Sequence, residues 1–533
     1  MKIKIILLSL CSLVIITARA QFISQISEPD ANITLSAIQM LGSNFVVAGS
    51  ENNEVLLSEI DINGTVLSSR TITIVDETVL PYVSSMIVDS DGKIVIAGYR
   101  VTPDVYQYTS FVVKYDYATG TIDWMRLFEN PGSAFLKIIE KKTDGPYIVC
   151  GQSINAPKGE EGILYSVNRN TGNFILLNNY NYNNSSETYY SLVKADGGYY
   201  TANRYNFDGG GSSRMRATIS KFSYTGSQLF TKAYIKNITT DIARLYASDI
   251  CFANGSLYMP VHGDETGALL NDDLFIVRSK PDGNLNWAKM YNLTHYGDDG
   301  SFSSIKSKGT AIYTLGALND GATDYTGDIF IMKMDSSGAV IWANSYGIQG
   351  NSRAGKSDAL LINGSNILAV GYTHNDVTGL NEGAVLFVKA STGNLPGGCS
   401  TNEPVTVTTK SSTSYAATLT AVTHTYTFSD STAIATSSDE SNMIICMNGA
   451  RFEQPESTIE IMPNPTNGQF QLELNGEENL IEIYNYNGQL MHSVSTEEIF
   501  VQMDITSSPA GIYYVKVRNV ISDEIQTVTI IKE

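Results

Sequence analysis

The chain repeats one pattern of apolar strands and polar turns seven times between residues 31 and 395. An apolar run, ending in glycine in most copies, is followed by a variable loop and a second apolar strand. Apolar runs of ~4–8 residues bounded by glycine are typical of buried strands. The first runs of the seven copies are FVVAG (45–49), IVIAG (94–98), YIVCG (147–151), YYTAN (199–203), LYMPV (257–261), IYTLG (312–316) and ILAVG (367–371).

A glycine turn follows the second strand of every copy. Such X-Gly pairs favour tight hairpins, because glycine tolerates a positive φ. One strand precedes each copy and another follows most turns, so each repeat is predicted to be a four-stranded meander of ~40–55 residues. The turns are Asn63-Gly64, Thr119-Gly120, Thr171-Gly172, Thr225-Gly226, Asp282-Gly283, Ser337-Gly338 and Thr392-Gly393.

The seven meanders predict an all-β fold, a seven-bladed β-propeller over residues 21–398. One meander cannot bury both of its faces, whereas seven packed radially can, with Trp124, Trp287 and Trp342 between neighbours. The seventh repeat lacks a fourth strand, because Pro396 follows its turn and proline cannot donate to a ladder. We therefore expect residues 21–27 to supply the missing outer strand and close the ring.

The repeats resemble those of a seven-bladed propeller family common in exported bacterial proteins. IFIMKMDSSGAVIWANSYG (329–347) is the copy most similar to that family's pattern, and KYDYATGTIDW (114–124) also looks like a quinoprotein propeller repeat. The resemblance covers about two-thirds of the chain and implies a fold rather than a function.

The composition changes after the repeats. Residues 399–458 are rich in Thr and Ser and predict either a linker or strands that lie on the propeller. Residues 459–533 then show roughly seven short strands, which predict a small β-sandwich. The domain boundaries expected are thus 1–20, 21–398, 399–458 and 459–533.

The last segment carries several short motifs in fixed order, from Pro463-Asn464-Pro465 with Gly468 to Gly511-Ile512-Tyr513. With these motifs it resembles the type A C-terminal sorting domain of type IX secretion. The resemblance implies recognition by the outer-membrane translocon, followed by removal by a sortase-like peptidase. It also implies that the product is attached to the cell surface or released. Each motif alone is ordinary turn-and-strand chemistry. The motif residues are Pro463, Asn464, Pro465, Gly468, Gly488, Gly511, Tyr513 and Lys516.

The first twenty residues predict a signal peptide. Lys2 and Lys4 precede an apolar stretch too short to span a bilayer, and Ala18-Arg19-Ala20 is a cleavage signal that leaves Gln21 first. Lipidation of Cys11 is the alternative, disfavoured by the large Leu10 before it. The sequence shows no other apolar run long enough for a transmembrane helix. We expect export through the periplasm to the outer cell surface or the medium.

The net charge limits the classes of binding partner, and the positions of the cysteines predict which are thiols and which form a disulfide. The formal net charge of −19 disfavours nucleic acid and anionic membranes, which need a basic patch. Cys150 and Cys251 lie in apolar strands and are expected to be buried thiols. Cys399 and Cys446 flank the Thr/Ser-rich stretch, and a disulfide between them is predicted for an exported chain.

The candidate binding surface is the disc face opposite the glycine turns. Its long loops are rich in Asp, Asn, Gly and Tyr, and loops on a rigid scaffold often bind ligands, although they also serve as solvated connectors. No cofactor is expected. Calcium is an alternative, because carboxylates are its preferred ligands, but the spacing matches no EF-hand. The loops are 99–109, 152–161, 204–216, 262–273, 317–328 and 372–383, and their calcium candidates are Asp264, Glu265, Asp272, Asp273, Asp320, Asp324 and Asp328.

No catalytic motif stands out. The five histidines are scattered, and neither H-E-x-x-H nor G-x-S-x-G occurs. The sequence predicts a non-catalytic protein that binds an extracellular ligand, a glycan or a protein, in adhesion. An exported hydrolase of glycans or peptides and a structural surface component are the alternatives. Clustered carboxylates in a deep axial pocket would favour the hydrolase, and a shallow face lined by Tyr and Asn would favour binding.

Overall fold

The computed structural model describes most of the chain between Phe22 and Glu533. Its residues form two compact units, Met1–Arg451 and Phe452–Glu533. All elements of the described residues are β-strands, and among them is no helix that is long and apolar enough to cross a membrane. The described residues are 22–28, 30–74, 80–102, 107–128, 132–154, 160–181, 187–206, 215–234, 244–264, 273–293, 300–318, 328–346, 351–375, 378–395, 400–410, 415–417, 420–422, 428–430, 433–438, 441–447, 461–462, 464–474, 479–485, 489–496, 498, 500–519 and 525–533.

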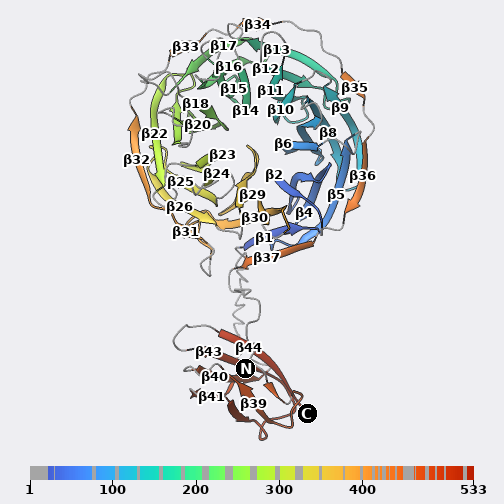
Figure 1. The fold of residues 1–533 in the computed structure, drawn as a ribbon, viewed down its shortest axis with the longest axis vertical. Coiled ribbons are helices and arrows are strands. Elements are labelled where there is room, and N and C mark those ends of the chain that lie inside the picture. Colours follow the sequence, from blue (N-terminus) through green and yellow to red (C-terminus); the bar gives the residue numbers. More distant parts are fainter. Residues whose placement is uncertain are drawn as a thin grey trace, which may run out of the picture. The chain divides into compact units, whose positions relative to one another are not determined.

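The first unit is a seven-bladed β-propeller, in which antiparallel meanders surround a central axis (Figure 1). Its first four blades follow the predicted repeats. Blade 1 holds β2 (Ile33–Leu41), β3 (Asn44–Glu51), β4 (Glu54–Ile60) and β5 (Val66–Ile74), and blade 2 holds β6 (Leu80–Val88), β7 (Ile94–Thr102), β8 (Gln107–Asp116) and β9 (Thr121–Phe128). Blade 3 holds β10 (Ala134–Glu140), β11 (Tyr147–Ile154), β12 (Glu160–Val167) and β13 (Phe174–Asn181), and blade 4 holds β14 (Glu187–Ala195), β15 (Gly198–Asn206), β16 (Met215–Ser223) and β17 (Gln228–Ala233).

In blades 5 and 7 the innermost strand is split in two. Blade 5 holds β18 (Arg244–Ala247), β19 (Cys251–Ala253), β20 (Ser256–Asp264), β21 (Asp273–Ser279) and β22 (Leu285–Leu293). Blade 6 holds β23 (Gly300–Lys308), β24 (Ala311–Leu318), β25 (Ile329–Met334) and β26 (Val340–Tyr346). Blade 7 holds β27 (Asn351–Ala354), β28 (Leu360–Asn363), β29 (Asn366–Asn375) and β30 (Leu380–Lys389).

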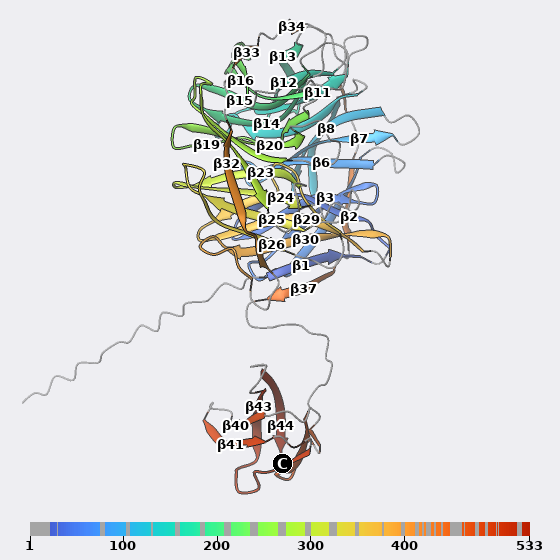
Figure 2. The same cartoon turned by 60° about the vertical axis from the view of Figure 1, so that its left-hand side comes forward.

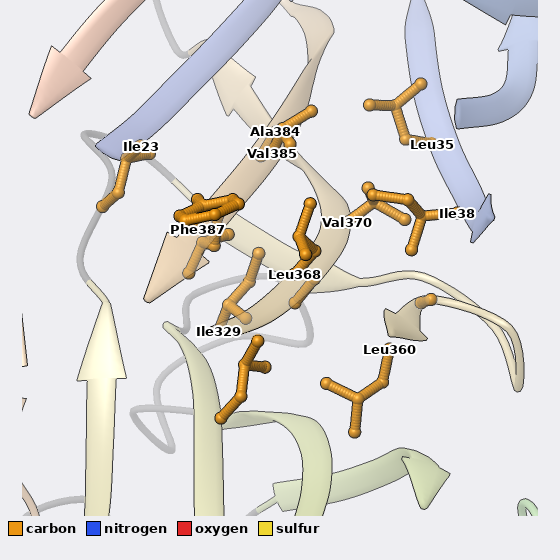
Figure 3. Close-up of a cluster of buried hydrophobic side chains, with 14 of the residues drawn as sticks. Ile23, Leu35, Ile38, Ile329, Leu360, Leu368, Val370, Ala384, Val385 and Phe387 are labelled. Atoms are coloured by element: carbon orange, nitrogen blue, oxygen red, sulfur yellow. The ribbon is translucent and has the colours of Figure 1, made fainter. Parts of the chain in front are cut away.

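The N-terminal strand closes the ring, as predicted. β1 (Phe22–Ser27) pairs antiparallel with β30, so that blade 7 combines both ends of the propeller. Phe22 stacks on Phe387 with ring centroids 5.3 Å apart. Around them, buried side chains from blades 6, 7 and 1 form one core cluster (Figure 3). The prediction that this strand is the outermost one of the blade is wrong, because another strand pairs along its other edge.

That additional strand belongs to residues 401–447, for which the sequence left a linker and propeller-bound strands open. The segment forms seven short strands that pair antiparallel with the outer strands of blades 6, 5, 4, 3, 2, 1 and 7 in this order (Figures 1 and 2). We call this segment the belt. Its strands are β31 (Thr401–Asn402), β32 (Val405–Lys410), β33 (Tyr415–Ala417), β34 (Thr420–Val422), β35 (Phe428–Asp430), β36 (Ala433–Ser438) and β37 (Ser441–Met447).

The predicted turn glycines have a packing role as well as a conformational one. Gly172 has φ +72°, and a Cβ added there would lie 2.5 Å from the ring of Trp124 in the preceding blade. Gly338 and Gly393 lie in the same way against Trp287 and Trp342. The expectation that tryptophans fill the space between neighbouring blades is therefore confirmed, and the glycines provide the room for them.

The second unit is the predicted sandwich of seven strands with its own apolar core. Its two sheets have the orders β38-β39-β42 and β41-β40-β43-β44. The strands are β38 (Ile461–Met462), β39 (Gln469–Glu473), β40 (Asn479–Asn485), β41 (Leu490–Thr496), β42 (Phe500–Asp504), β43 (Gly511–Asn519) and β44 (Ile525–Lys532).

Candidate functional site

The innermost strands place one equivalent position of every repeat, polar in six of the seven blades, at the centre of the propeller. In five blades this strand bulges immediately before that position, for example between Val83 and Ser85 and between Phe135 and Lys137. In blades 5 and 7 the strand breaks there, at Asp249 and Asp358. We call these positions the axial ring. The axial ring consists of Ala37, Ser85, Lys137, Ser191, Asp249, Ser304 and Asp358, and all of them are buried.

A bulge leaves a backbone N–H without a partner in its own sheet, and the ring supplies partners from other blades. Ile38 donates to the carbonyl oxygen of Asp358 at 2.9 Å, and Ile138 donates to Ser85 Oγ at 3.1 Å. Ile305 donates to Asp249 Oδ2 at 2.9 Å. The axial ring therefore ties blades to one another through groups that no single repeat could satisfy.

Two lysines neutralise the two axial carboxylates. Lys137 forms an ion pair with Asp358, and Ser85 donates to the same carboxylate. Lys306 Nζ lies 3.6 Å from Asp249 and 3.7 Å from Asp358. Burial by itself would raise the pKa of Asp358, but Lys137 and Lys306 outweigh it and hold this pKa below its usual value. Asp358 is therefore ionised and paired, which does not suit a general acid.

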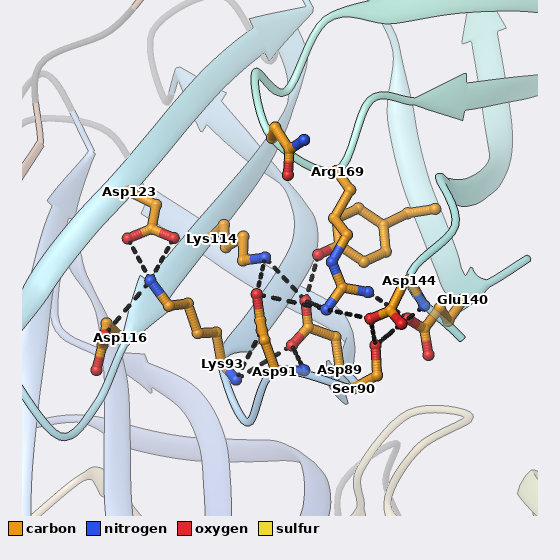
Figure 4. Close-up of polar contacts among 12 residues, drawn as sticks. Asp89, Ser90, Asp91, Lys93, Lys114, Asp116, Asp123, Glu140, Asp144 and Arg169 are labelled. Atoms are coloured by element: carbon orange, nitrogen blue, oxygen red, sulfur yellow. Dashed lines mark hydrogen bonds and ion pairs between the residues drawn. The ribbon is translucent and has the colours of Figure 1, made fainter. Parts of the chain in front are cut away.

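The disc face that carries the glycine turns has a second ion cluster, which joins blades 2 and 3 (Figure 4). Lys114 Nζ lies 2.9 Å from both Asp89 and Asp91, and Arg169 Nη2 lies 3.3 Å from Asp89. Tyr147 donates to Asp89. The side chain of Asp89 is fully buried, so its charge is held by these three partners and this cluster serves the packing of blades.

On the loop side of the axial ring, tyrosines from four blades gather near the axis. Tyr82 stacks on Tyr99 with centroids 5.2 Å apart, and Tyr99 contacts Tyr108 at 5.6 Å. Burial raises the pKa of Tyr82, and the neighbouring Tyr108 and Tyr372 add to this effect. We call these side chains the tyrosine cluster. Tyr190 lies near enough to Tyr99, and Tyr246 near enough to Tyr190, for each to act electrostatically on the other's hydroxyl, so the tyrosine cluster consists of Tyr82, Tyr99, Tyr108, Tyr190, Tyr246 and Tyr372.

Arg204 connects the tyrosine cluster to polar groups of blades 3 and 5. Its guanidinium forms an ion pair with Glu160 and lies 5.7 Å from the ring centroid of Tyr246. Tyr246 in turn stacks on His262 at 5.7 Å. Burial lowers the pKa of His262 to about 4, so this imidazole is neutral at physiological pH. The charges of Glu160 and Arg204 therefore compensate each other beside the tyrosine cluster.

The cluster remains accessible at one place. Tyr82 keeps 39% of its surface exposed, whereas the other members of the cluster are half-buried. Burial raises the pKa of Tyr190 to about 12, which keeps its hydroxyl protonated. A partly exposed tyrosine ring beside further hydroxyls and one compensated ion pair can contact a ligand ring and exchange hydrogen bonds with hydroxyl groups.

A buried carboxyl pair lies on the same side of blades 3 and 4. Burial raises the pKa of Glu187 well above its usual value, and Glu161 contributes to the shift. Such a pair is the arrangement that an acid catalyst needs. However, Glu161 is 0% and Glu187 2% exposed, so a substrate does not reach them in this structure.

The metal candidates predicted from the loops are not brought together in the described residues. Asp264 ends β20 and Asp273 begins β21, where Asp273 pairs with Gly263, and Asp328 precedes β25. In the part of the chain that the structure describes, no group of three or more His, Cys, Asp or Glu residues is placed to hold a metal ion. Asp272, Asp320, Asp324 and Glu265 lie outside the described residues, and calcium stays a prediction.

Of the cysteine predictions, one can be compared with the described residues and one cannot. Cys150 and Cys251 are free and buried, as predicted. Cys446 lies in β37 opposite Ile23, but Cys399 lies outside the described residues, so the disulfide stays a prediction. The signal peptide and its cleavage site at Ala20 and Gln21 also lie outside the described residues.

In the sorting motifs, the Pro-Asn-Pro turn is fastened to the last strand. Asn464 Nδ2 donates to the carbonyl of Thr529 at 2.8 Å, and Ile531 donates back to Asn464 Oδ1 at 3.0 Å. Tyr513 donates to the carbonyl of Pro509 at 2.6 Å, and Lys516 lies 3.5 Å from Glu482. Further members of the motif set are Pro465 and Gly468 in the turn and Gly511 at the start of β43, whereas Pro463 and Gly488 lie outside the described residues.

Comparisons with known proteins identify the second unit. Residues 460–532 match the family described as secretion system C-terminal sorting domain. The chain therefore carries a sorting domain of the type IX secretion system, which indicates export to the cell surface or secretion and an interaction with the secretion system. No curated protein sequence matches the chain.

Several solved structures share the fold at low similarity. An α-L-arabinofuranosidase from Fusarium graminearum matches with 11% identity and a TM-score of 0.39, over 60% of this chain and 95% of that one. An α-L-arabinanase from Penicillium chrysogenum matches with 8% identity and a TM-score of 0.38, over 60% and 95%. PorZ, a type IX secretion surface component of Porphyromonas gingivalis, matches with 10% identity and a TM-score of 0.20, over 94% and 86%. These likenesses are too weak to indicate an activity for this chain.

The sequence reasoning found part of this site. It indicated the loop-side ends of the strands, where Tyr99, Tyr108, Arg204, His262 and Tyr372 lie. It missed the tyrosines of the innermost strands and the axial ring. A signal was present: when the repeats are aligned, a polar residue precedes an apolar one at the same position of six innermost strands, as in Ser85-Met86 and Asp249-Ile250.

Proposed function

We propose that this exported propeller binds an uncharged, hydroxyl-rich extracellular ligand, a glycan, through the tyrosine cluster, and that it does so without converting the ligand. The observation that carries the proposal is the stacked Tyr82–Tyr99 pair beside the neutralised Arg204–Glu160 pair. A planar aromatic face suits the apolar face of a sugar ring, and the net charge of −19 disfavours an acidic polymer.

The charges of the propeller support binding over hydrolysis. A glycosidase uses two carboxyl groups, one as an acid and one as a base or nucleophile. The axial carboxylates Asp249 and Asp358 are held by lysines, and Glu160 is held by Arg204. Attachment of a surface-displayed or released protein to glycans then accounts for the export signal and for the accessible tyrosine face.

A glycan array probed with the full mature chain tests this proposal, together with product analysis after incubation with the oligosaccharides that bind. Tyr82→Ala should weaken binding by about threefold to tenfold, which corresponds to the loss of an aromatic contact of ~0.5–1.5 kcal/mol. Tyr82→Phe keeps the ring and is the matched control. Absence of binding by the folded chain, or an equal loss in both variants, contradicts the proposal.

The hydrolase alternative has one specific observation in its favour, the raised pKa of Glu187 beside Glu161. If any oligosaccharide is cleaved, Glu187→Gln should abolish the cleavage while binding persists. Cleavage of any kind would overturn the non-catalytic proposal, and cleavage that survives Glu187→Gln would also exclude this pair as its cause.

A further inference from the structure

We infer that the belt acts as an intramolecular strap that completes every blade, so that the ring stays closed and monomeric after the sorting domain is removed. The inference concerns how the propeller persists outside the cell and does not depend on which ligand it binds. It follows from the sheet pairing, from the packing of β32, and from the division of the chain into two units.

Without the belt, the outer edge of every blade would be open. Each blade would then end in an outer strand with a free row of N–H and C=O groups, which is a template for pairing with another chain. β5, for example, spans Val66–Ile74, and β36 covers its stretch from Ser69 to Ile74. The belt places along these edges described strands of two to seven residues, and short strands are poor templates.

The belt strand β32 packs as part of its blade. Val405 and Val407 of β32 contact the core cluster that contains Tyr291 and Leu293, whereas Thr406 and Thr408 are exposed. This alternation of apolar and polar positions is that of a strand with one buried face. The strap is therefore held by side-chain burial as well as by backbone hydrogen bonds.

The start of the belt is anchored by a buried acid. Glu403 is 3% exposed, and Ser345 Oγ of β26 donates to its carboxylate at 2.5 Å. The N–H of Glu403 donates to the carbonyl of Ala343 at 2.8 Å. A buried carboxylate is stabilised only by such partners, so this contact fixes where the belt begins on blade 6.

The other end of the belt covers the strand that closes the ring. β37 pairs with β1 over the whole length of β1, from Phe22 opposite Met447 to Ser27 opposite Ser441. β1 therefore lies between β30 and β37 and has no open edge. The strand that closes the propeller is therefore paired on both sides.

The belt and the sorting domain belong to different units of the chain. All belt strands fall within the unit Met1–Arg451, whereas the sorting domain, Phe452–Glu533, has its own core. Cleavage between the two units removes none of the seven belt strands. The belt is thus the part of the C-terminal region that the exported propeller keeps.

A cleavage experiment on the full mature chain tests the first half of the inference. A specific protease site placed at Pro455 allows the sorting domain to be removed after folding. The melting temperature of the propeller should change by less than ~2 °C, and the product should elute as a monomer. A large fall in melting temperature or aggregation after the cut would overturn the inference, because the strap would then not suffice.

Belt variants of the same full chain test the second half. One of any two consecutive N–H groups of a strand points at its neighbour, so double proline substitutions break the pairing wherever they are placed. Thr406→Pro/Val407→Pro in β32 and Ala435→Pro/Thr436→Pro in β36 should lower the melting temperature by about 10 °C or more. They should also make the chain self-associate.

The matched controls are Thr406→Ser/Val407→Thr in β32 and Ala435→Ser/Thr436→Ser in β36, which keep every N–H. Hydrogen exchange gives a local readout. Amides of β22 should exchange at least tenfold faster in the β32 proline variant, and amides of β5 in the β36 proline variant, while those of β3 and β20 stay protected. A proline variant that is as stable, monomeric and protected as the control would refute the strap. A control that is equally destabilised would show that side chains, and not strand pairing, hold the belt, which also overturns it.

Discussion

Gly172 offers a direct test of how neighbouring blades fit together. It and Gly120 occupy the same turn position in blades 3 and 2, and both have φ +72°. A Cβ at Gly172 would lie 2.5 Å and 2.8 Å from two ring atoms of Trp124, whereas the nearest atom to a Cβ at Gly120 is Tyr115 Oη at 3.8 Å. The pair therefore separates the cost of the backbone conformation from the cost of the inter-blade contact.

The expected magnitudes follow from these distances. An alanine in the left-handed region costs about 1–2 kcal/mol, reduced by ~0.4–1 kcal/mol because alanine also restricts the unfolded chain. We expect Gly120→Ala to lower the free energy of unfolding by about 1 kcal/mol. Gly172→Ala adds overpacking of ~1–3 kcal/mol against the indole, and should cost about 2–4 kcal/mol in total.

The assay is guanidinium unfolding of the mature chain followed by far-UV circular dichroism. A smaller side chain at Trp124 should relieve the overpacking, so the double variant Gly172→Ala/Trp124→Leu should show a favourable coupling of about 0.5–3 kcal/mol. Equal losses for Gly120→Ala and Gly172→Ala, or no coupling with Trp124, would refute the idea that the turn glycines exist to seat the tryptophans.

Three further predictions concern the ring, the thiols and the tail. Asp358→Asn should lower the free energy of unfolding at pH 7 by about 3–5 kcal/mol, because Lys137 loses a buried partner. Folding lowers the pKa of Asp358, so the stability that this carboxylate contributes is present above the unfolded pKa of about 3.9 and is lost as the pH falls below it. The free energy of unfolding of the variant should therefore depend less on pH below pH 4 than that of the wild type. Parallel curves for the two proteins would contradict this. Burial raises the pKa of the Cys150 and Cys251 thiols. In a Cys399→Ser/Cys446→Ser chain both thiols should therefore resist Ellman's reagent at pH 8 until guanidinium is added. Rapid reaction of the folded chain would count against their burial. Deleting residues 459–533 should trap the chain in the periplasm, as measured by cell fractionation, and normal surface display would refute the sorting role.

Much of the fold was predictable because its signals are local. The run ILAVG (367–371) predicts a strand and Gly393 predicts a tight turn, each from a few residues, and they form β29 and the turn after β30. The closing role of β1 was also predictable, because Pro396 leaves the seventh repeat one strand short. The sorting domain was recognisable from motifs whose side chains, such as Asn464, bind within their own small unit.

The candidate site was less predictable, because its residues meet only across blades. Tyr82 and Tyr372 are far apart in the sequence and approach one another only when the ring closes. Whether a Thr/Ser-rich segment is a linker or a strap cannot be read from its composition. That depends on whether unpaired strand edges are within its reach, and only the closed propeller presents them.

The sequence by itself thus determined the strands and turns of the repeats, the number of repeats and the sorting role of the C-terminal unit, since each depends on side-chain periodicity or on short motifs. Only the tertiary structure decided that Ser85 donates to Asp358 across 273 residues, that two lysines neutralise the axis, and that the belt covers every blade. Those contacts satisfy buried N–H groups, carboxylates and strand edges, and their partners exist only once all seven blades are in place.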